Sequence, residues 1–357
     1  MFSILVPLLL LTPFASTTAI PLPKTCREYT IPVTVTAGTY VWGLPNLTTN
    51  YDAATFTTEL ARWDANVTFH PISGFVNTTG SYEISGTFCA PTKGESSTVL
   101  IATHGLGFDR GYWDPEIQPE KYSFVDYAIS KGYSVFFYDR LGISDSSVIS
   151  GYTTQVSLQT TILAQLVNLT RSGHFASATT PPPTKVILLG HSFGSVVSNY
   201  LLSTFPSLVD GAILTGIGYH VPDSDVAFEA WQPRLARLQS PGRWRQLDGG
   251  WVTWVDIWAN VNTFFKAPFY DQKVVEYAEA NKQPFALMEV ISLSITDLHS
   301  PNFTGPVLVM SGEFDLIFCN GDCTPLLEPY AKPYFPASKD LMVHVQPGSG
   351  HGINFSM

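Results

Sequence analysis

Residues 190–194 read Gly-His-Ser-Phe-Gly, a G-x-S-x-G pattern that can hold a reactive serine on a sharp turn. An apolar run at residues 185–189 precedes the pattern, and a helical pattern begins near Ser195. In a strand–turn–helix of this kind the glycines allow close backbone approach, while the serine takes a strained conformation that exposes its hydroxyl. The N-terminus of the following helix favours negative charge at the same place. The pattern therefore predicts that Ser192 is a nucleophile, and the alternative is an ordinary Gly/Ser turn.

A serine hydroxyl needs an imidazole to take its proton. His351 lies in Gly-Ser-Gly-His-Gly at residues 348–352, just after the last apolar run, and we predict that it is the base. His344 also lies near the C-terminus, but it falls inside a strand pattern and is better explained as a core histidine. The other histidines outside the serine motif lie near the N-terminus, in predicted loops or in the insertion described below: His70, His104, His174, His220 and His299.

The imidazole in turn needs a carboxylate that fixes its tautomer. With a G-x-S-x-G nucleophile, the acid follows the serine in the chain and precedes the histidine. Asp315 stands just past the apolar run at residues 306–310, and we predict that it is this acid. Four other carboxylates remain as alternatives, two beside Asp315 and two after the run at residues 212–215: Glu313, Asp322, Asp223 and Asp225.

The sequence His-Gly-Leu-Gly at residues 104–107 follows another apolar run and can form part of an oxyanion hole. A turn of this type supplies one backbone N–H, and the residue after the nucleophile supplies the other. We therefore predict that Leu106 and Phe193 are the two donors. The side chain of His104 is expected to brace the loop and not to act as a base.

The segments around these motifs alternate between strand and helix patterns. Short apolar runs without polar alternation are typical of strands buried on both faces, and they occur at residues 98–103, 133–138, 185–189, 212–215, 306–310 and 341–345. Helical patterns lie at residues 121–131, 156–169 and 195–205, and antiparallel strands are expected at 28–42 and 81–90. This order predicts an α/β fold with a mostly parallel, doubly wound sheet.

The interval at residues 216–301 is too long for a simple crossover between two strands. It contains five of the eight tryptophans: Trp231, Trp244, Trp251, Trp254 and Trp258. We predict a helical, aromatic-rich cap over the carboxyl ends of the strands, where sheets of this kind place their sites. The two parts of the core would then be residues 20–215 and 302–357. We expect Trp251 and Trp254 to influence substrate choice, and the alternative is a purely structural layer.

Several features predict entry into the secretory pathway. The apolar run at residues 4–11 is followed by small residues and is too short to span a bilayer, so we predict a signal peptide at residues 1–19. No Lys or Arg precedes the run, and the alternative is a buried N-terminal strand. Six sequons for N-glycosylation are present, at Asn46, Asn66, Asn77, Asn168, Asn302 and Asn354. The four cysteines do not have zinc-site spacing and predict two disulfides in an oxidising compartment, Cys26–Cys89 and Cys319–Cys323.

The composition excludes some classes of protein. Hydrophobic residues make up 45% of the chain and charged residues only 13%, which excludes a disordered protein. The formal net charge is −10 and no basic stripe is present, so we expect no nucleic-acid partner. No stretch after the first apolar run approaches 18 apolar residues, so stable membrane insertion is not expected. No cluster of metal ligands is apparent, and no metal or cofactor is expected.

The motifs and their order resemble those of the α/β-hydrolase superfamily, close to secreted fungal α/β-hydrolase-1 type esterases. The likeness extends over residues 80–357 and rests on five segments: HGLG (104–107), YDRLGIS (138–144), GHSFG (190–194), SGEFD (311–315) and GSGHG (348–352). It implies that Ser192, Asp315 and His351 form a catalytic triad and that residues 138–144 are a structural loop. Dehalogenases and epoxide hydrolases of the superfamily carry Asp as the nucleophile, so Ser192 argues against both activities.

The resemblance also implies a reaction, in which a hydrophobic ester or lactone is cleaved through an acyl-enzyme. Three alternatives remain: an acyltransferase or thioesterase-like enzyme with the same triad, a cofactor-free perhydrolase with the same triad, and a non-catalytic binding protein of the same fold. Proteins of this kind usually continue after the histidine into a helix that packs on the sheet. Only six residues follow His351, so we expect this helix to be missing from the given sequence. A truncated gene model would explain this, and the alternative is a chain that covers the face of the sheet by other means.

Overall fold

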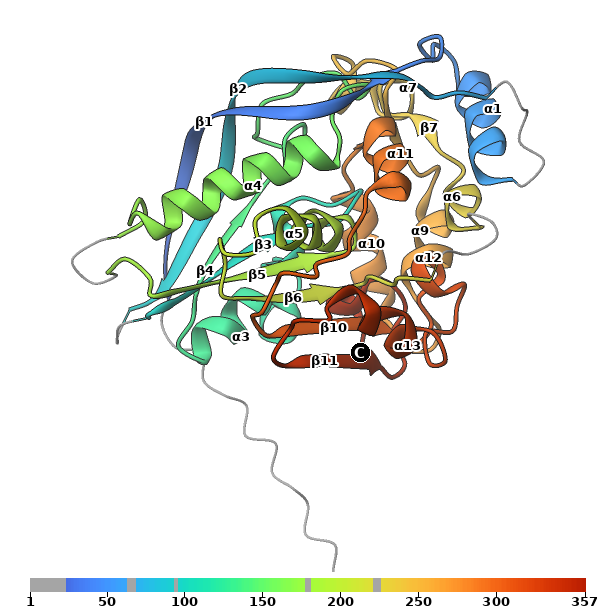
Figure 1. The fold of residues 1–357 in the computed structure, drawn as a ribbon. Coiled ribbons are helices and arrows are strands. Elements are labelled where there is room, and N and C mark those ends of the chain that lie inside the picture. The colour runs from blue at the N-terminus through green and yellow to red at the C-terminus, as the bar shows by residue number, and fades with distance from the viewer. Residues whose placement is uncertain (1–23, 63–68, 93–95, 177–180, 221–225) are drawn as a thin grey trace, which may run out of the picture.

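The computed structural model describes residues 24–62, 69–92, 96–176, 181–220 and 226–357, and Figure 1 draws the remainder in grey. Four sequence-based predictions fall outside these ranges: the signal peptide at 1–19, the acids Asp223 and Asp225, and the sequon residue Asn66. No helix within the described ranges is both long and apolar enough to cross a membrane.

An eight-stranded sheet forms the centre of the fold, with the strand order β1-β2-β4-β3-β5-β6-β10-β11. Its strands are β1 (Lys24–Trp42), β2 (Ile72–Pro91), β3 (Thr98–Thr103), β4 (Ser134–Tyr138), β5 (Lys185–His191), β6 (Gly211–Thr215), β10 (Val307–Gly312) and β11 (Leu341–Gln346). β1 and β2 pair antiparallel, β2 pairs antiparallel with β4, and all neighbours from β4 to β11 are parallel. The predicted fold class, with its mostly parallel sheet, is confirmed.

Helices connect and cover the strands of the sheet. The core helices are α2 (Pro119–Tyr122), α3 (Phe124–Ser130), α4 (Val156–Arg171), α5 (Phe193–Thr204), α12 (Leu316–Cys319) and α13 (Leu327–Ala331). α4 and α5 pack against each other, and Figure 1 shows both on one face of the sheet. The helix predicted at residues 121–131 is split into α2 and α3, because Ser123 is the N-cap of α3 and its hydroxyl accepts a hydrogen bond from the Asp126 N–H.

Between β6 and β10 the chain forms the segment that we predict as the cap. Its elements are α6 (Val226–Trp231), β7 (Arg234–Leu235), α7 (Ala236–Gln239), α8 (Pro241–Trp244), β8 (Trp251–Thr253), α9 (Ile257–Phe264), α10 (Gln272–Ala280), β9 (Phe285–Ala286) and α11 (Leu287–Ile295). The three strands form a small antiparallel sheet, which the sequence analysis did not predict. In Figure 1 this segment lies to the right of β5 and β6, on the side where these strands end.

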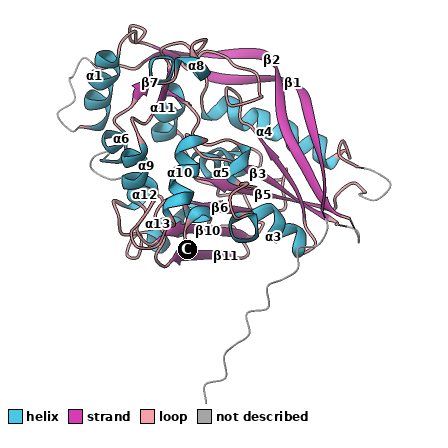
Figure 2. Ribbon diagram, turned by 180° about the vertical axis from the view of Figure 1, so that it is seen from behind, coloured by secondary structure: helices cyan, strands magenta, loops and turns pink. Residues whose placement is uncertain are grey.

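A helix inside the N-terminal hairpin also belongs to this side of the molecule. α1 (Asn50–Ala61) lies between β1 and β2 in the chain and packs against α6 and β7, and both Figure 1 and Figure 2 show it beside α6. A capping box begins the helix, because Thr49 Oγ1 accepts a hydrogen bond from the Asp52 N–H while the Asp52 carboxylate accepts one from the Thr49 N–H. The sequence analysis predicted no element here.

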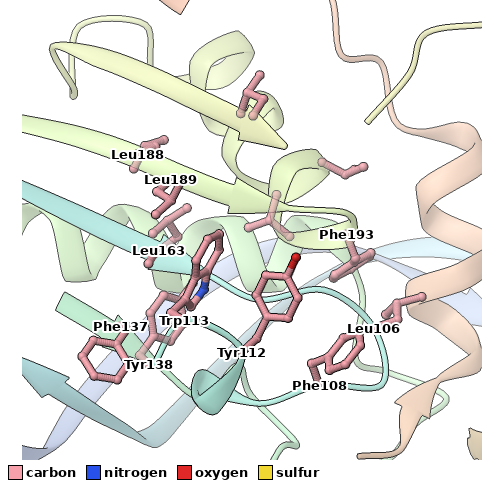
Figure 3. Close-up of a cluster of buried hydrophobic side chains, with 14 of the residues drawn as sticks. Leu106, Phe108, Tyr112, Trp113, Phe137, Tyr138, Leu163, Leu188, Leu189 and Phe193 are labelled. Carbon is pink, nitrogen blue, oxygen red and sulfur yellow. The ribbon is translucent and has the colours of Figure 1, made fainter. Parts of the chain in front are cut away.

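The core and the disulfides hold these elements together. Figure 3 shows part of the core, with Phe137 and Tyr138 from β4, Leu163 from α4, and Leu188 and Leu189 from β5. The structure contains both predicted disulfides. Cys26–Cys89 joins directly opposed positions of β1 and β2, and Cys319–Cys323 closes a short loop at the end of α12.

Candidate active site

Ser192 occupies a strained turn between β5 and α5. Its φ of 55° and ψ of −123° lie in a region that residues with a side chain rarely adopt. The turn packs tightly on the end of β3, because a Cβ on Gly194 would overlap the carbonyl oxygen of Thr103. The Ser192 N–H donates a hydrogen bond of 2.8 Å to the carbonyl of Thr215 at the end of β6. The strand–turn–helix expected from the sequence is therefore present, and Ser192 lines a cavity from it.

His351 and Asp315 lie together, although 36 residues separate them in the chain. His351 Nδ1 is 2.7 Å from Asp315 Oδ2, and both side chains are completely buried. The other carboxylate oxygen, Asp315 Oδ1, accepts hydrogen bonds from the N–H groups of Ile317 and Phe318, so Asp315 is also the N-cap of α12. These bonds fix the carboxylate in the orientation that a triad acid needs.

The alternative acids that the structure describes have other partners. The Glu313 carboxylate accepts a hydrogen bond from the Gly348 N–H, so it holds the loop that leads to His351. The Asp322 carboxylate accepts one from the Thr324 N–H in a turn. The geometry therefore favours Asp315 among these three carboxylates.

His351 Nε2, the nitrogen that would face a nucleophile, is buried and has no hydrogen-bond partner. The ring of His191, the residue before Ser192, lies 5.0 Å from the ring of His351. Phe318, a wall residue of the cavity that Ser192 lines, lies 5.8 Å from the same ring. The catalytic roles of the three residues stay predictions, which this arrangement supports.

The other histidines near the site are held in neutral, structural roles. Burial lowers the pKa of His104 well below its usual range, and the nearby Arg140 charge lowers it further. His104 Nε2 accepts a hydrogen bond from the backbone N–H of Arg140, so the proton of the ring is on Nδ1. Nδ1 donates this proton in a hydrogen bond to the carbonyl of Gly105, as expected for a residue that braces the loop. Burial likewise lowers the pKa of His191, whose ring stacks on Tyr112 at 4.3 Å.

The expectation for His344 was wrong. This residue lies on β11 at the edge of the sheet, where its side chain is exposed and Nε2 is 3.3 Å from Gln346 Oε1. The apolar run predicted a strand covered on both faces. The described residues leave one face of this edge strand open, and exposed side chains alternate along it.

The two predicted oxyanion donors lie beside Ser192. A Cβ on Gly105 would be 2.9 Å from Ser192 Cβ, so the peptide between Gly105 and Leu106 runs directly past the nucleophile. Phe193 is the first residue of α5, where the backbone N–H has no acceptor within the helix. Leu106 lines the same cavity as Ser192. In Figure 3 Leu106 and Phe193 are drawn at the same end of the buried cluster. The geometry supports both assignments.

The cavity above Ser192 has a volume of about 520 Å³ and is mostly apolar. Leu106 and Val196 lie beside Ser192, and Phe228 and Trp231 contribute from the cap. Polar side chains, including Arg62 and Asp297, also line it. Leu60, Ala61 and Arg62, at the end of α1, form part of the wall that the sequence analysis missed. The capping box at Thr49 was the available signal for this helix.

The tryptophans of the cap differ in their position relative to the cavity. Trp231 lines the cavity, whereas Trp251 and Trp254 do not and are completely buried. Trp251 Nε1 donates to the carbonyl of Ile149 in the core, and Trp254 Nε1 donates to the Glu279 carboxylate. Both rings also pack on core loops, because a Cβ on Gly142 would overlap the Trp251 ring and a Cβ on Gly107 would overlap the Trp254 ring. In place of the expected influence on substrate choice, we now predict a structural role for both residues, because neither lines the cavity.

Comparisons with known proteins agree with this architecture. The model of the alpha/beta hydrolase family matches residues 99–357, and no curated protein matches the chain. An esterase from Thermogutta terrifontis is 18% identical with a TM-score of 0.51, over 76% of this chain and 87% of that one. An enol-lactonase from Burkholderia xenovorans LB400 is 16% identical with a TM-score of 0.52, over 76% of this chain and 91% of that one. These two likenesses show the fold, and because the family model covers most of the chain, this protein belongs to the alpha/beta hydrolase family.

Proposed function

We propose that this protein is a secreted serine hydrolase, close to the fungal esterases named above, that cleaves a carboxylic ester or lactone of a hydrophobic substrate. The observation that carries the proposal is the buried His351–Asp315 pair beside a cavity lined by Ser192, whose backbone is strained. Each part of this arrangement has a role in acyl transfer, and together they match the three requirements of nucleophile, base and orienting acid.

The reaction runs in two halves. Ser192 Oγ attacks the carbonyl carbon while His351 Nε2 takes the hydroxyl proton, and Asp315 stabilises the imidazolium that forms. The N–H groups of Leu106 and Phe193 donate to the negative oxygen of the tetrahedral intermediate. The imidazolium then protonates the leaving alcohol and leaves an acyl-enzyme. In the second half His351 removes a proton from water, which attacks the acyl group. The imidazolium then returns this proton to Ser192 Oγ as the acid is released.

The cavity supports a hydrophobic substrate of moderate size. Its volume of about 520 Å³ falls in the range of pockets that enclose small organic ligands. The solved structures with the same fold include an esterase and an enol-lactonase. Hydrolysis of an ester or a lactone is a reaction that a serine nucleophile can carry out through a covalent acyl-enzyme.

Three observations support secretion. The N-terminal sequence has the pattern of a signal peptide, the structure contains two disulfides, and four sequon residues are exposed: Asn46, Asn77, Asn168 and Asn302. Asn354 is different, because its Nδ2 donates hydrogen bonds to the carbonyls of Tyr112 and Tyr122. We propose that the four exposed sites carry glycans and that Asn354 does not.

The experiment is a substrate panel on the purified full-length protein. Nitrophenyl esters with acyl chains from two to twelve carbons and a series of lactones are tested, with Ser192→Ala as the control. We expect Ser192-dependent turnover that favours apolar acyl groups. Adding an alcohol distinguishes the acyltransferase alternative, since that enzyme would form mainly ester while a hydrolase would form mainly free acid. Turnover that survives in Ser192→Ala would contradict the proposal.

A further inference from the structure

A completely buried ion pair joins the cap to the loop after β4. Arg140, within the segment 138–144 that we expected to be only structural, is 0% exposed, and so is its partner Glu289 in α11. Arg140 Nη1 donates to Glu289 Oε1. Gln159 of α4 donates to the same oxygen at 2.9 Å, and the N–H of Ala286 donates to the other oxygen at 3.2 Å. The glutamate is therefore fixed from the core and from the cap.

The guanidinium of Arg140 also contacts Gly105, which precedes the predicted donor Leu106, and Phe193, the other predicted donor. Arg140 Nη2 donates to the carbonyl of Gly105 at 3.3 Å. Its guanidinium carbon lies 4.6 Å from the centre of the Phe193 ring, an arrangement in which a cation is attracted to the aromatic face. Arg140 Nε is buried without a hydrogen-bond partner. The guanidinium thus contacts both sides of the predicted oxyanion hole.

The contact with Gly105 has a direct consequence for Leu106. The Gly105 carbonyl and the Leu106 N–H belong to one planar peptide unit and point in opposite directions. A cation on the carbonyl fixes the plane of that peptide, and it also draws electron density away from the N–H on the other side. His104 Nδ1 holds the same carbonyl oxygen at 2.9 Å, so two donors define its orientation.

A buried ion pair is a poor explanation for stability alone. Removing two charges from water carries a large desolvation penalty, and replacing such a pair by apolar side chains of similar volume is often neutral or stabilising. A positive charge beside an oxyanion site, in contrast, stabilises the negative charge that develops in the transition state. The location of the pair therefore points to a role in the reaction.

We propose that Arg140 is a positioning residue that orients and polarises the oxyanion donors, and that Glu289 of the cap holds it in place. The proposal rests on the serine-hydrolase function above. On this account docking of α11 on the core helps to assemble the oxyanion hole, so the cap contributes to catalysis through a residue that does not contact substrate.

The test uses the double variant Arg140→Met/Glu289→Leu, which removes both charges together. Two of the neighbouring polar groups keep other partners, since His104 still donates to the Gly105 carbonyl and Gln159 Nε2 still donates to the Leu141 carbonyl. The Ala286 N–H loses its acceptor, and the melting temperature measures the effect of that loss on stability. The control is Arg171→Met/Asp210→Leu, which removes a partly exposed ion pair of 2.6 Å at the end of α4. Melting temperature, kcat, KM and the inhibition constant of a trifluoromethyl ketone, which forms a tetrahedral adduct with the nucleophile, are measured for each.

We expect the double variant to melt cooperatively, to lose about 100-fold in kcat with little change in KM, and to bind the trifluoromethyl ketone about 100-fold more weakly. The control should change neither kinetic quantity. A folded double variant with wild-type kcat and ketone affinity overturns the proposal, as does an equal loss in the control.

If the double variant does not fold, Arg140→Lys replaces it, because lysine keeps the charge but lacks the planar fork that reaches Glu289 and Gly105 together. It should lose kcat with KM retained, and unchanged kcat would again overturn the proposal. An inactive wild-type enzyme would instead overturn the serine-hydrolase function, and this proposal with it.

Discussion

The N–H of Gly352 donates a hydrogen bond of 2.8 Å to the carbonyl of Phe264, which joins the His351 loop to the last residue of α9. The last carbonyl groups of a helix receive no hydrogen bond from N–H groups of the same helix, so this bond gives one of the unpaired carbonyls of α9 a donor. The Phe264 ring lies 5.4 Å from the His351 ring, and the N–H of Met357 donates to the carbonyl of Phe269 farther along the cap. The cap is therefore connected to the predicted base by its backbone, and displacement of α9 would displace His351.

Trp231→Ala should change the preference among substrates. The indole lines the cavity and lies 5.9 Å from the Phe264 ring, so its removal enlarges the apolar space. We expect kcat/KM for long-chain esters to rise relative to short ones by about tenfold, a factor typical of a changed apolar pocket. Trp258→Ala is the control, because Trp258 is 69% exposed. If all esters change by one common factor, the assignment of this wall is wrong.

Trp251→Ala should act on stability instead of selectivity. Trp251 is completely buried between the cap and the core, and truncation of such a side chain typically destabilises a protein by about 3–5 kcal/mol. Thermal melting measures the loss, and the ester preference of the fraction that remains folded should match that of the wild type. A changed preference without a change in melting temperature would restore the original expectation that this residue influences substrate choice.

Removal of the Cys319–Cys323 disulfide should reduce kcat more than stability. The two cysteines are only four positions apart in the chain, so their disulfide restrains little of the unfolded chain and the stability loss should stay under about 3 kcal/mol. The same loop returns to the predicted acid, because the Gly321 N–H donates to the carbonyl of Asp315. The variant is Cys319→Ser/Cys323→Ser, with kcat and melting temperature as the measurements.

The other disulfide provides the control for this prediction. Cys26→Ser/Cys89→Ser opens a cross-link with a separation of 63 residues between two strands of the N-terminal hairpin. The free energy of unfolding should fall by about 4 kcal/mol, which lowers the melting temperature clearly, while the folded enzyme keeps its kcat. Equal effects of both double variants on kcat and melting temperature would mean that Cys319–Cys323 is a structural cross-link only.

The stability of the fold should fall as pH rises through a window set by Asp139. Burial raises the pKa of the Asp139 carboxyl from 3.8 to about 7, although the Arg110 guanidinium 3.2 Å away lowers it in part. Between these two values the native state holds a proton that the unfolded state has released, so this group's contribution to stability is lost as pH rises from about 4 to about 7. Asp139→Asn removes this pH dependence. The difference in melting temperature, variant minus wild type, should therefore be larger at pH 8 than at pH 4.5. Asp145→Asn, an exposed carboxylate near the same guanidinium, is the control, and a difference that is constant with pH would contradict the prediction.

Local sequence patterns predicted those residues of the site that lie in a single turn or just after a strand. The turn of Ser192 is encoded by five consecutive residues. Asp315 and His351 lie about five or six residues past an apolar run, so their positions at one edge of the sheet followed from the strand order. The partners Arg140 and Glu289 are 149 residues apart in the chain, and no local pattern encodes such a contact. The one available signal was a carboxylate inside the apolar segment Leu287–Ile295, since a charge in such a helix is buried only with a partner.

The central claim is that Ser192 forms a covalent acyl-enzyme with the help of His351 and Asp315. The most direct test treats wild type and Ser192→Ala with a fluorophosphonate and measures the intact mass of each protein, with ester turnover in parallel. We predict one phosphonyl group per wild-type molecule, located on the peptide that contains Ser192, and no mass increase in the variant, whose kcat should fall by about 10⁴-fold or more. Phosphonylation of Ser192→Ala at wild-type stoichiometry, or an active wild-type enzyme that the reagent leaves unmodified, would contradict this account.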